Sequence, residues 1–269
     1  MLLYNKDTRP CPSASKTIMT LIQERLQAVQ SHIKQAMTNR DSQHILNKTG
    51  EVTLLAVSKA QSAESLREAF MAGQKQFGEN YLQEALNKQT ELADLAIEWH
   101  FIGPIQSNKT QPIAQHFSWV HGVDRLKIAQ RLNDARPPEL GPLQICLQVN
   151  ISGEASKSGA NPDDLASLAT AIQTMPHLQL RGLMTIPEPT DDQNLQRQRF
   201  QQMRTLLQNL NKHWVLNKNL TPLDTLSMGM SNDYLLAIEE GANIVRVGSA
   251  IFGARPTKTI NEIKGCQHD

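Results

Sequence analysis

The segment VTLLAVSKAQSAESLREAFMAG, residues 52–73, decides the fold class. It begins with a short apolar run, Val52–Val57, whose β-branched residues are typical of a buried β-strand. Ser62 is then suited to cap the N-terminus of a helix, and Gly73 is suited to end that helix. The segment therefore predicts one β-strand followed by one α-helix.

The same alternation continues along the chain. Further strands are predicted near Gln76–Phe77 and at Ile97–Ile102, Trp119–Val123, Leu143–Val149, Leu178–Ile186, Leu223–Ser227 and Ile244–Val247. Helices are predicted between them, at about Tyr81–Leu95, after Asn108, from Leu126, after Asn161–Pro162, along a face with Leu195, Met203, Leu206 and Leu210, and at Tyr234–Glu240. Eight strands separated by helices indicate an α/β fold, a (β/α)₈ TIM-type barrel, with an open doubly wound sheet as the alternative.

An additional helix precedes the first strand. Ile18, Ile22, Leu26, Val29 and Ile33 recur at intervals of three and four residues, which predicts a helix over about residues 16–38. No linker or low-complexity segment divides residues 1–269, so we expect a single domain with its core at about residues 50–256. Residues 1–15 and 257–269 are expected to be frayed ends.

Composition excludes several classes of partner. The chain has 27 Lys and Arg against 26 Asp and Glu, so it lacks the excess of positive charge that would favour nucleic acid or an anionic membrane. Its three cysteines, Cys11, Cys146 and Cys266, are far apart and have no metal-binding spacing, which predicts no metal site and a reducing compartment. No stretch has the length of a membrane span, and we expect a cytoplasmic protein with a small-molecule ligand.

Two strand ends carry side chains suited to ligand binding. In barrels of this kind, functional groups gather at the carboxyl ends of the strands. Lys59 follows the first strand, where partial burial would disfavour its ammonium form and leave an amine able to attack a carbonyl. The alternative is an ordinary lysine that reaches solvent at the rim. Glu79 and Asn80 follow the second strand, where they either face the mouth of the barrel or cap the next helix.

Two later segments have the composition of anion-binding loops. Ser227, Gly229 and Ser231 belong to a run that leads directly into a helix, and Gly248 and Ser249 follow the last strand. Barrels often bind phosphate between the loops after strands seven and eight, and these segments occupy those positions. Each could instead be a plain turn. Arg246 lies within an apolar strand and needs a partner, for which a ring nitrogen of a bound ligand is one candidate.

Several of these motifs, in this order, closely resemble the pyridoxal phosphate homeostasis protein family, single-domain relatives of the alanine racemase barrel. The resemblance covers residues 52–256. Its motifs are residues 56–59, 77–81, 99–109 (WHFIGPIQSNK), 149–152 with Lys157 and Gly159, 181–184 (RGLM), 226–233 (LSMGMSND) and 245–253 (VRVGSAIFG).

The resemblance implies a cofactor and a set of residues around it. Lys59 would hold pyridoxal 5′-phosphate (PLP) as an internal aldimine, Arg246 would face the pyridine nitrogen, and Asn80 would lie beside the ring. The phosphate would be surrounded by Ser227, Gly229, Ser231, Gly248 and Ser249. His100 is assigned no role, because a single strand histidine without a partner motif is usually part of the core.

The resemblance also implies a carrier that buffers PLP within the cell, with apo PLP-dependent enzymes as candidate recipients and with no catalytic residues. An arginine at the ring nitrogen disfavours its protonation and so weakens the ring as an electron sink. The chain is also too short to include the additional β-domain from which alanine racemases take a tyrosine, and we expect a monomer. A PLP-dependent amino-acid racemase and a cofactor-free Schiff-base aldolase that uses Lys59 remain as alternatives.

Overall fold

A closed barrel of parallel strands forms the centre of the protein, as the sequence predicts. The structure, a computed structural model, describes residues 19–47, 49–152, 158–216 and 222–254. The strands pair in the order of the chain, and the barrel closes where the last strand pairs with the first. They are β1 (Thr53–Val57), β2 (Gln76–Glu79), β3 (Glu98–Phe101), β4 (Trp119–Val123), β5 (Leu143–Gln148), β6 (Leu178–Met184), β7 (Thr225–Met230) and β8 (Ile244–Val247).

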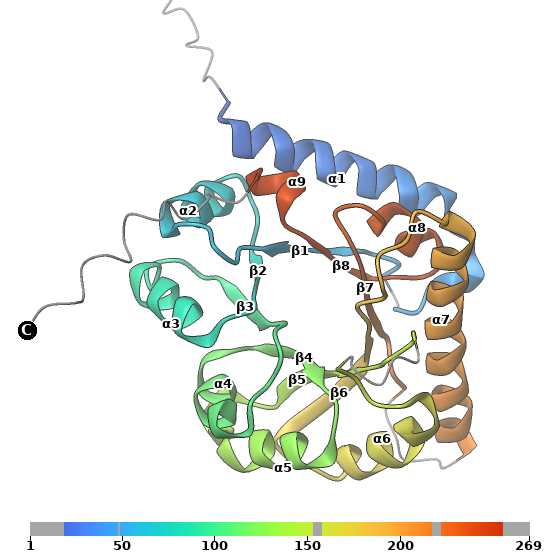
Figure 1. Cartoon of the computed structure of the whole chain (residues 1–269). Helices are drawn as coiled ribbons and strands as arrows, with labels where there is room; N and C mark the ends of the chain where they lie inside the picture. The colour runs from blue at the N-terminus through green and yellow to red at the C-terminus, as the bar shows by residue number, and fades with distance from the viewer. Residues whose placement is uncertain (1–18, 48, 153–157, 217–221, 255–269) are drawn as a thin grey trace, which may run out of the picture.

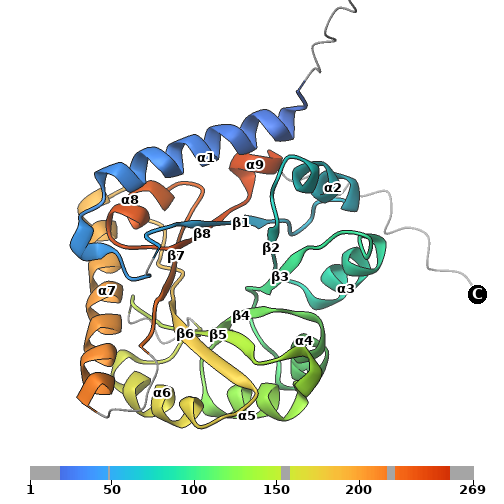
Figure 2. The same cartoon turned by 180° about the vertical axis from the view of Figure 1, so that it is seen from behind.

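Helices surround this barrel (Figures 1 and 2). They are α1 (Leu21–Asn39), α2 (Ala63–Met71), α3 (Leu82–Glu91), α4 (Thr110–His116), α5 (Leu126–Ala135), α6 (Leu165–Gln173), α7 (Gln193–Leu216), α8 (Tyr234–Glu239) and α9 (Ser249–Phe252). The predicted caps are present at α2, where the Ser62 side chain accepts a hydrogen bond from the backbone N–H of Ser65 and Gly73 adopts a φ of 102°.

The N-terminal helix completes the ring of helices. α9, which follows the last strand, is only four residues long, and α1 packs against α2, α8 and α9 on that side of the barrel (Figure 1). The apolar face of α1 is buried there at Leu26, Val29, Ile33 and Ala36. α1 therefore covers the side of the barrel that a longer helix after β8 would otherwise cover.

Several predicted boundaries need correction. β7 was expected to end at Ser227 but continues to Met230, because its last residues still pair with β8. α3 ends at Glu91 rather than at Leu95. Leu195, expected on the apolar face of α7, is 38% exposed, whereas Phe200, a residue not in the predicted face, is fully buried.

Some predicted features lie outside the described residues. These are Cys11, Cys266, Lys157, the first residues of the predicted N-terminal helix and both expected frayed ends. Among the described residues, no helix has both the length and the apolar character that a membrane crossing requires. Likewise, the described part contains no group of three or more His, Cys, Asp or Glu side chains that could hold a metal ion.

Candidate functional site

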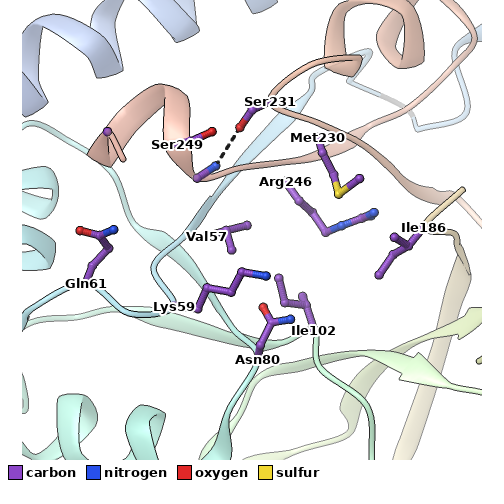
Figure 3. Close-up of a pocket in the computed structure, with 12 residues that line it drawn as sticks. Val57, Lys59, Gln61, Asn80, Ile102, Ile186, Met230, Ser231, Arg246 and Ser249 are labelled. Carbon is purple, nitrogen blue, oxygen red and sulfur yellow. Dashed lines mark hydrogen bonds between the residues drawn. The ribbon is translucent and has the colours of Figure 1, made fainter. Parts of the chain in front are cut away.

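A cavity of about 230 Å³ opens at the carboxyl ends of the strands (Figure 3). Six residues predicted from the sequence line it: Lys59, Asn80, Ser231, Arg246, Gly248 and Ser249. The remaining lining residues are Val57, Gln61, Ile102, Ile186, Met230 and Gly253. The cavity thus combines apolar walls with an amine, a guanidinium, two amides and two hydroxyls, which is typical of a small-molecule site.

Lys59 reaches into this cavity from the end of β1, and its terminal nitrogen points toward the space beside Asn80 and Ile102 (Figure 3). The backbone next to it is held in an uncommon conformation, since Ala60 has a φ of 60°. The N–H of Ala60 donates a 2.6 Å hydrogen bond to the Glu84 carboxylate on α3. The turn that carries Lys59 is therefore fixed by a neighbouring helix.

A buried ion pair between Lys88 and Glu79 fixes Ser58, the residue that precedes Lys59. Lys88 on α3 donates to the carbonyl oxygen of Ser58 at 2.7 Å and to the carboxylate of Glu79 at 2.8 Å. The Ser58 hydroxyl donates to the same carboxylate at 2.6 Å, and Lys88 also pairs with Glu84 at 2.6 Å. The Lys88 ammonium thus holds Ser58 directly and Ala60 through Glu84, on the two sides of Lys59.

Glu79 was predicted either to face the mouth of the barrel or to cap α3, and neither prediction is correct. Its side chain is completely buried against Lys88 and Ser58. Burial raises the pKa of Glu79 from its ordinary value, and the ammonium of Lys88 opposes that shift. Glu79 positions the Lys59 turn without lining the cavity.

The loops after β7 and β8 meet on the opposite side of the cavity. The Ser231 hydroxyl accepts a 3.3 Å hydrogen bond from the backbone N–H of Gly248, and Ser249 follows directly (Figure 3). A side chain at Gly248 would place its Cβ 3.0 Å from the carbonyl oxygen of Val57. Gly248 therefore allows the β8 loop to lie close to the end of β1.

Two residues predicted to surround a phosphate do not line the cavity. Ser227 lies within β7, fully buried, and its hydroxyl contacts Arg246 and His121. Gly229 has a φ of 90°, and a Cβ there would lie 2.6 Å from that of Ala237, so it permits α8 to pack against β7. Ser227 and Gly229 both lie inside β7 rather than at its end or in a loop, because β7 extends to Met230.

Arg246 lies at the floor of the cavity with only 3% of its surface exposed. Its guanidinium donates to the Ser227 hydroxyl at 2.8 Å and to the carbonyl oxygen of Thr185 at 2.7 Å. Burial lowers the pKa of Arg246 to about 10, so the group remains a cation at neutral pH. The partners that the sequence required for this buried charge are thus two neutral oxygens.

One buried acceptor is left over at the cavity. The side-chain carbonyl oxygen of Asn80 has no hydrogen-bond partner among the described residues, although Asn80 lines the cavity. Buried polar atoms are normally paired. A ligand bearing a hydrogen-bond donor would supply the missing partner, or a flip of the amide would present its N–H₂ to a ligand acceptor.

Several residues that the sequence did not indicate support the site without lining the cavity. Lys88 contacts Ser58, Thr185 contacts Arg246, and His100 contacts Ser227 through His121. For the two histidines a signal was available, because residues 100 and 121 lie on the paired strands β3 and β4. Lys88 lies within α3 between Asn87 and Gln89 and gives no comparable signal.

Comparison with protein families agrees with this architecture. Residues 25–256 match the family model described as alanine racemase, N-terminal domain. Among solved structures, alanine racemase from Corynebacterium glutamicum shares the fold with a TM-score of 0.62 at 17% identity, over 90% of this chain and 63% of that one. The fold and the cavity therefore define a protein of the alanine racemase N-terminal domain class.

Nearer relatives identify the family within that class. The pyridoxal phosphate homeostasis protein of Pseudomonas aeruginosa is 56% identical over 88% of this chain and 97% of its own length. The Escherichia coli K12 protein of the same name is 49% identical over 76% of this chain and 86% of its own length. PipY of Synechococcus elongatus, solved with PLP bound, has a TM-score of 0.74 at 36% identity, over 86% of this chain and all of that one. The chain belongs to the pyridoxal phosphate homeostasis protein family.

The Lys88 ion pair leads to a prediction about stability. Replacing Lys88 with Met leaves the Glu79 carboxylate buried without its cation, which we expect to cost about 3–5 kcal/mol of unfolding free energy near neutral pH. The loss should shrink in mildly acidic buffer. Burial alone then raises the pKa of Glu79 further, so the folded variant takes up a proton that the unfolded chain releases. Urea unfolding at the two pH values measures both effects.

Lys127→Met on α5 is the matched control, since Lys127 is exposed. It should change the free energy of unfolding by less than about 0.5 kcal/mol at either pH. A Lys88→Met protein as stable as the control would contradict the role given to the buried pair.

Proposed function

We propose that this protein binds PLP covalently through the Lys59 amine and acts as a carrier or buffer of PLP in intracellular vitamin B6 and amino-acid/keto-acid homeostasis. One observation carries the proposal: Lys59 and the Ser231–Gly248–Ser249 loops border the same cavity. The names of the relatives and the PLP-bound PipY structure support it.

The groups around the cavity match the functional groups of PLP. The Lys59 amine can form an imine with the aldehyde, while the hydroxyls of Ser231 and Ser249 and the nearby backbone N–H groups can donate to the phosphate. Arg246 can donate to the pyridine nitrogen, and Asn80 can bond to a polar substituent of the ring. When bound, PLP supplies a reactive aldehyde and an electron-accepting ring.

The predicted contacts to phosphate are revised in one respect. Ser227 and Gly229 were predicted to surround the phosphate together with Ser231, Gly248 and Ser249. We now propose that Ser231, Gly248 and Ser249 hold the phosphate, whereas Ser227 supports Arg246 from inside the barrel.

A carrier role is favoured over a racemase role by the charge at the ring nitrogen. An arginine that remains protonated disfavours a proton on the nitrogen it faces, and an unprotonated ring stabilises a carbanion less well. Among the tyrosines in the described residues, Tyr81 is 61% exposed, and the hydroxyl of Tyr234 lies 3.4 Å from Nδ1 of His32 on α1. Neither lines the cavity, so neither supplies a second acid or base opposite Lys59.

The proposal extends to how the protein works in the cell. We propose a cytoplasmic monomer that passes PLP to apo forms of PLP-dependent enzymes. The cysteine that lies in the described residues supports a reducing compartment, because Cys146 is an unpaired thiol. Burial raises its pKa to about 12, so it stays in the unreactive thiol form.

The first prediction concerns the covalent link. Protein loaded with PLP should show the visible absorbance band of a lysine imine, and Lys59→Ala should lose that band, because no other amine lines the cavity in the described part of the chain. Lys109→Ala, at the end of the loop after β3, is the control and should keep it. An unchanged band in Lys59→Ala would reject the assignment.

The second prediction concerns the phosphate. Ser231→Ala and Ser249→Ala should each weaken PLP binding by about 0.5–3 kcal/mol, the range that covers a lost hydrogen bond from a neutral one up to one with a charged group. Equilibrium dialysis of the variants measures this directly. Ser167→Ala, on the exposed face of α6, should bind PLP like the parent protein. If both cavity variants also bind like the parent, the phosphate lies elsewhere.

The third prediction concerns turnover. Single enantiomers of a panel of amino acids, incubated with PLP-loaded protein, should keep their optical rotation, because Arg246 would place a cation at the ring nitrogen and no second base among the described residues lines the cavity. An authentic alanine racemase run in parallel confirms that the assay detects racemisation. Loss of rotation that depends on Lys59 would replace the carrier proposal with an enzymatic one.

A further inference from the structure

A chain of polar side chains crosses the interior of the barrel below the cavity. The ring of His100 lies 3.2 Å (Nε2) from the Glu98 carboxylate and 2.9 Å (Nδ1) from Nε2 of His121. The other ring nitrogen of His121, Nδ1, lies 2.8 Å from the Ser227 hydroxyl, which accepts from Arg246 at 2.8 Å. Four successive hydrogen bonds thus join Glu98, at the start of β3, to the arginine at the cavity floor.

The middle of this chain is sealed from solvent. His100, His121 and Ser227 are each 1% exposed or less, whereas the side chain of Glu98 is 40% exposed at the amino end of its strand. His100 also stacks on Trp119, with ring planes 3° apart and centroids separated by 5.4 Å. A core of this size could have been filled by apolar residues, so the polar chain requires an explanation.

The groups at the two ends of this series of hydrogen bonds determine the direction in which each bond donates. Arg246 can only donate hydrogen bonds, and an ionised Glu98 can only accept them. With neutral imidazoles, one arrangement satisfies every group. Arg246 donates to Ser227, and the Ser227 hydroxyl donates to Nδ1 of His121. His121 then donates from Nε2 to Nδ1 of His100, and His100 donates from Nε2 to Glu98.

The reverse direction is unfavourable unless a proton is added. It would set the lone pair of His100 Nε2 against the Glu98 carboxylate, and it would leave the Ser227 hydroxyl hydrogen without its acceptor. A proton added at His100 removes the conflict with the Glu98 carboxylate. It still leaves the Ser227 hydroxyl hydrogen without an acceptor. The direction of these hydrogen bonds therefore decides whether the Ser227 hydroxyl, which accepts from Arg246, also has an acceptor for its own hydrogen.

We propose that His100 and His121 are positioning residues, which fix Ser227 and through it the orientation of Arg246, so that Glu98 at the opposite end of the barrel influences how the cavity holds its ligand. The ligand part of this inference rests on the proposed PLP-binding function. The hydrogen-bond direction does not, because it follows from the protein's own donors and acceptors.

The surrounding charges agree with neutral imidazoles at neutral pH. Burial lowers the pKa of His100, against an opposing effect of Glu98, and burial lowers that of His121 well below its ordinary value, helped by His100 and Arg246. The hydrogen bond from His100 holds the pKa of Glu98 low, so its carboxylate stays ionised. The nearby strands add Arg181 over the Trp119 ring, its partner Asp224, and the protonated thiol of Cys146, while Asp233 acts on Arg246 from the loop after β7.

The first test measures the histidine tautomers in the ligand-free protein. Long-range ¹H–¹⁵N NMR distinguishes protonated from unprotonated ring nitrogens, and both His100 and His121 should carry their proton on Nε2 with Nδ1 unprotonated. A proton on Nδ1 of either ring near neutral pH would overturn the proposal, whether or not the protein binds PLP.

The second test changes Glu98, the end of the series of hydrogen bonds that lies farthest from the cavity. Glu98→Gln replaces a pure acceptor with a group that can also donate, so both directions become possible. We expect both tautomers at His100 and a PLP dissociation constant that is about 2- to 10-fold larger by equilibrium dialysis, the range for the loss of one neutral hydrogen bond. Glu91→Gln, an exposed residue at the end of α3, is the control and should change neither.

The outcomes separate this proposal from the proposed function. Unchanged tautomers in Glu98→Gln, or changed tautomers with the parent's PLP affinity, would each overturn the positioning role while leaving PLP binding intact. A parent protein that does not bind PLP would instead reject the proposed function, and with it the ligand part of this inference. The NMR result would then decide only the direction of the hydrogen bonds between Glu98 and Arg246.

Discussion

The pairing of β8 with β1 is the constraint on which the rest of the structure depends. Its register sets Leu55 beside Arg246 and Ala56 beside Val247. Lys59 and Gly248, which are far apart in the chain, consequently emerge from neighbouring strands at the same edge of the barrel. Without this closure the amine and the serine-containing loops would not border one cavity. α1, which covers this side of the barrel in place of a long helix after β8, also supports the closure.

Two buried polar systems hold the functional groups that this closure brings together. Lys88, Glu79 and Glu84 fix the turn before and after Lys59, and the two histidines reach Arg246 through hydrogen bonds to Ser227. Buried charges and polar groups contribute less to stability than apolar packing of the same volume. Their presence is better understood as positional, because each system contacts the surroundings of one residue that lines the cavity: the backbone beside Lys59, and Arg246 through Ser227.

The sequence predicts the barrel and most of the cavity, but it predicts poorly how the site is supported. Alternation of apolar runs and capped helices was enough for the eight strands, and the strand-end rule located Lys59, Asn80, Ser231 and Gly248. The misplaced end of β7 is more instructive, since three further residues of strand moved Ser227 from the rim into the interior. Small residues such as Ser and Gly mark neither a strand nor a loop clearly. Contacts such as Lys88 with Ser58 depend on how a helix packs, which no local pattern specifies.

Under the proposed function, the cavity would hold PLP through Lys59 and set the Arg246 cation against the ring nitrogen, which suits retention and delivery better than turnover. This requires that one PLP molecule spans from Lys59 to the loops after β7 and β8. The most direct measurement is reduction of the PLP-loaded protein with borohydride, followed by peptide mapping with mass spectrometry. We expect one added pyridoxyl group, located on Lys59. Attachment at a different lysine as the main product, or no attachment at all, would contradict it.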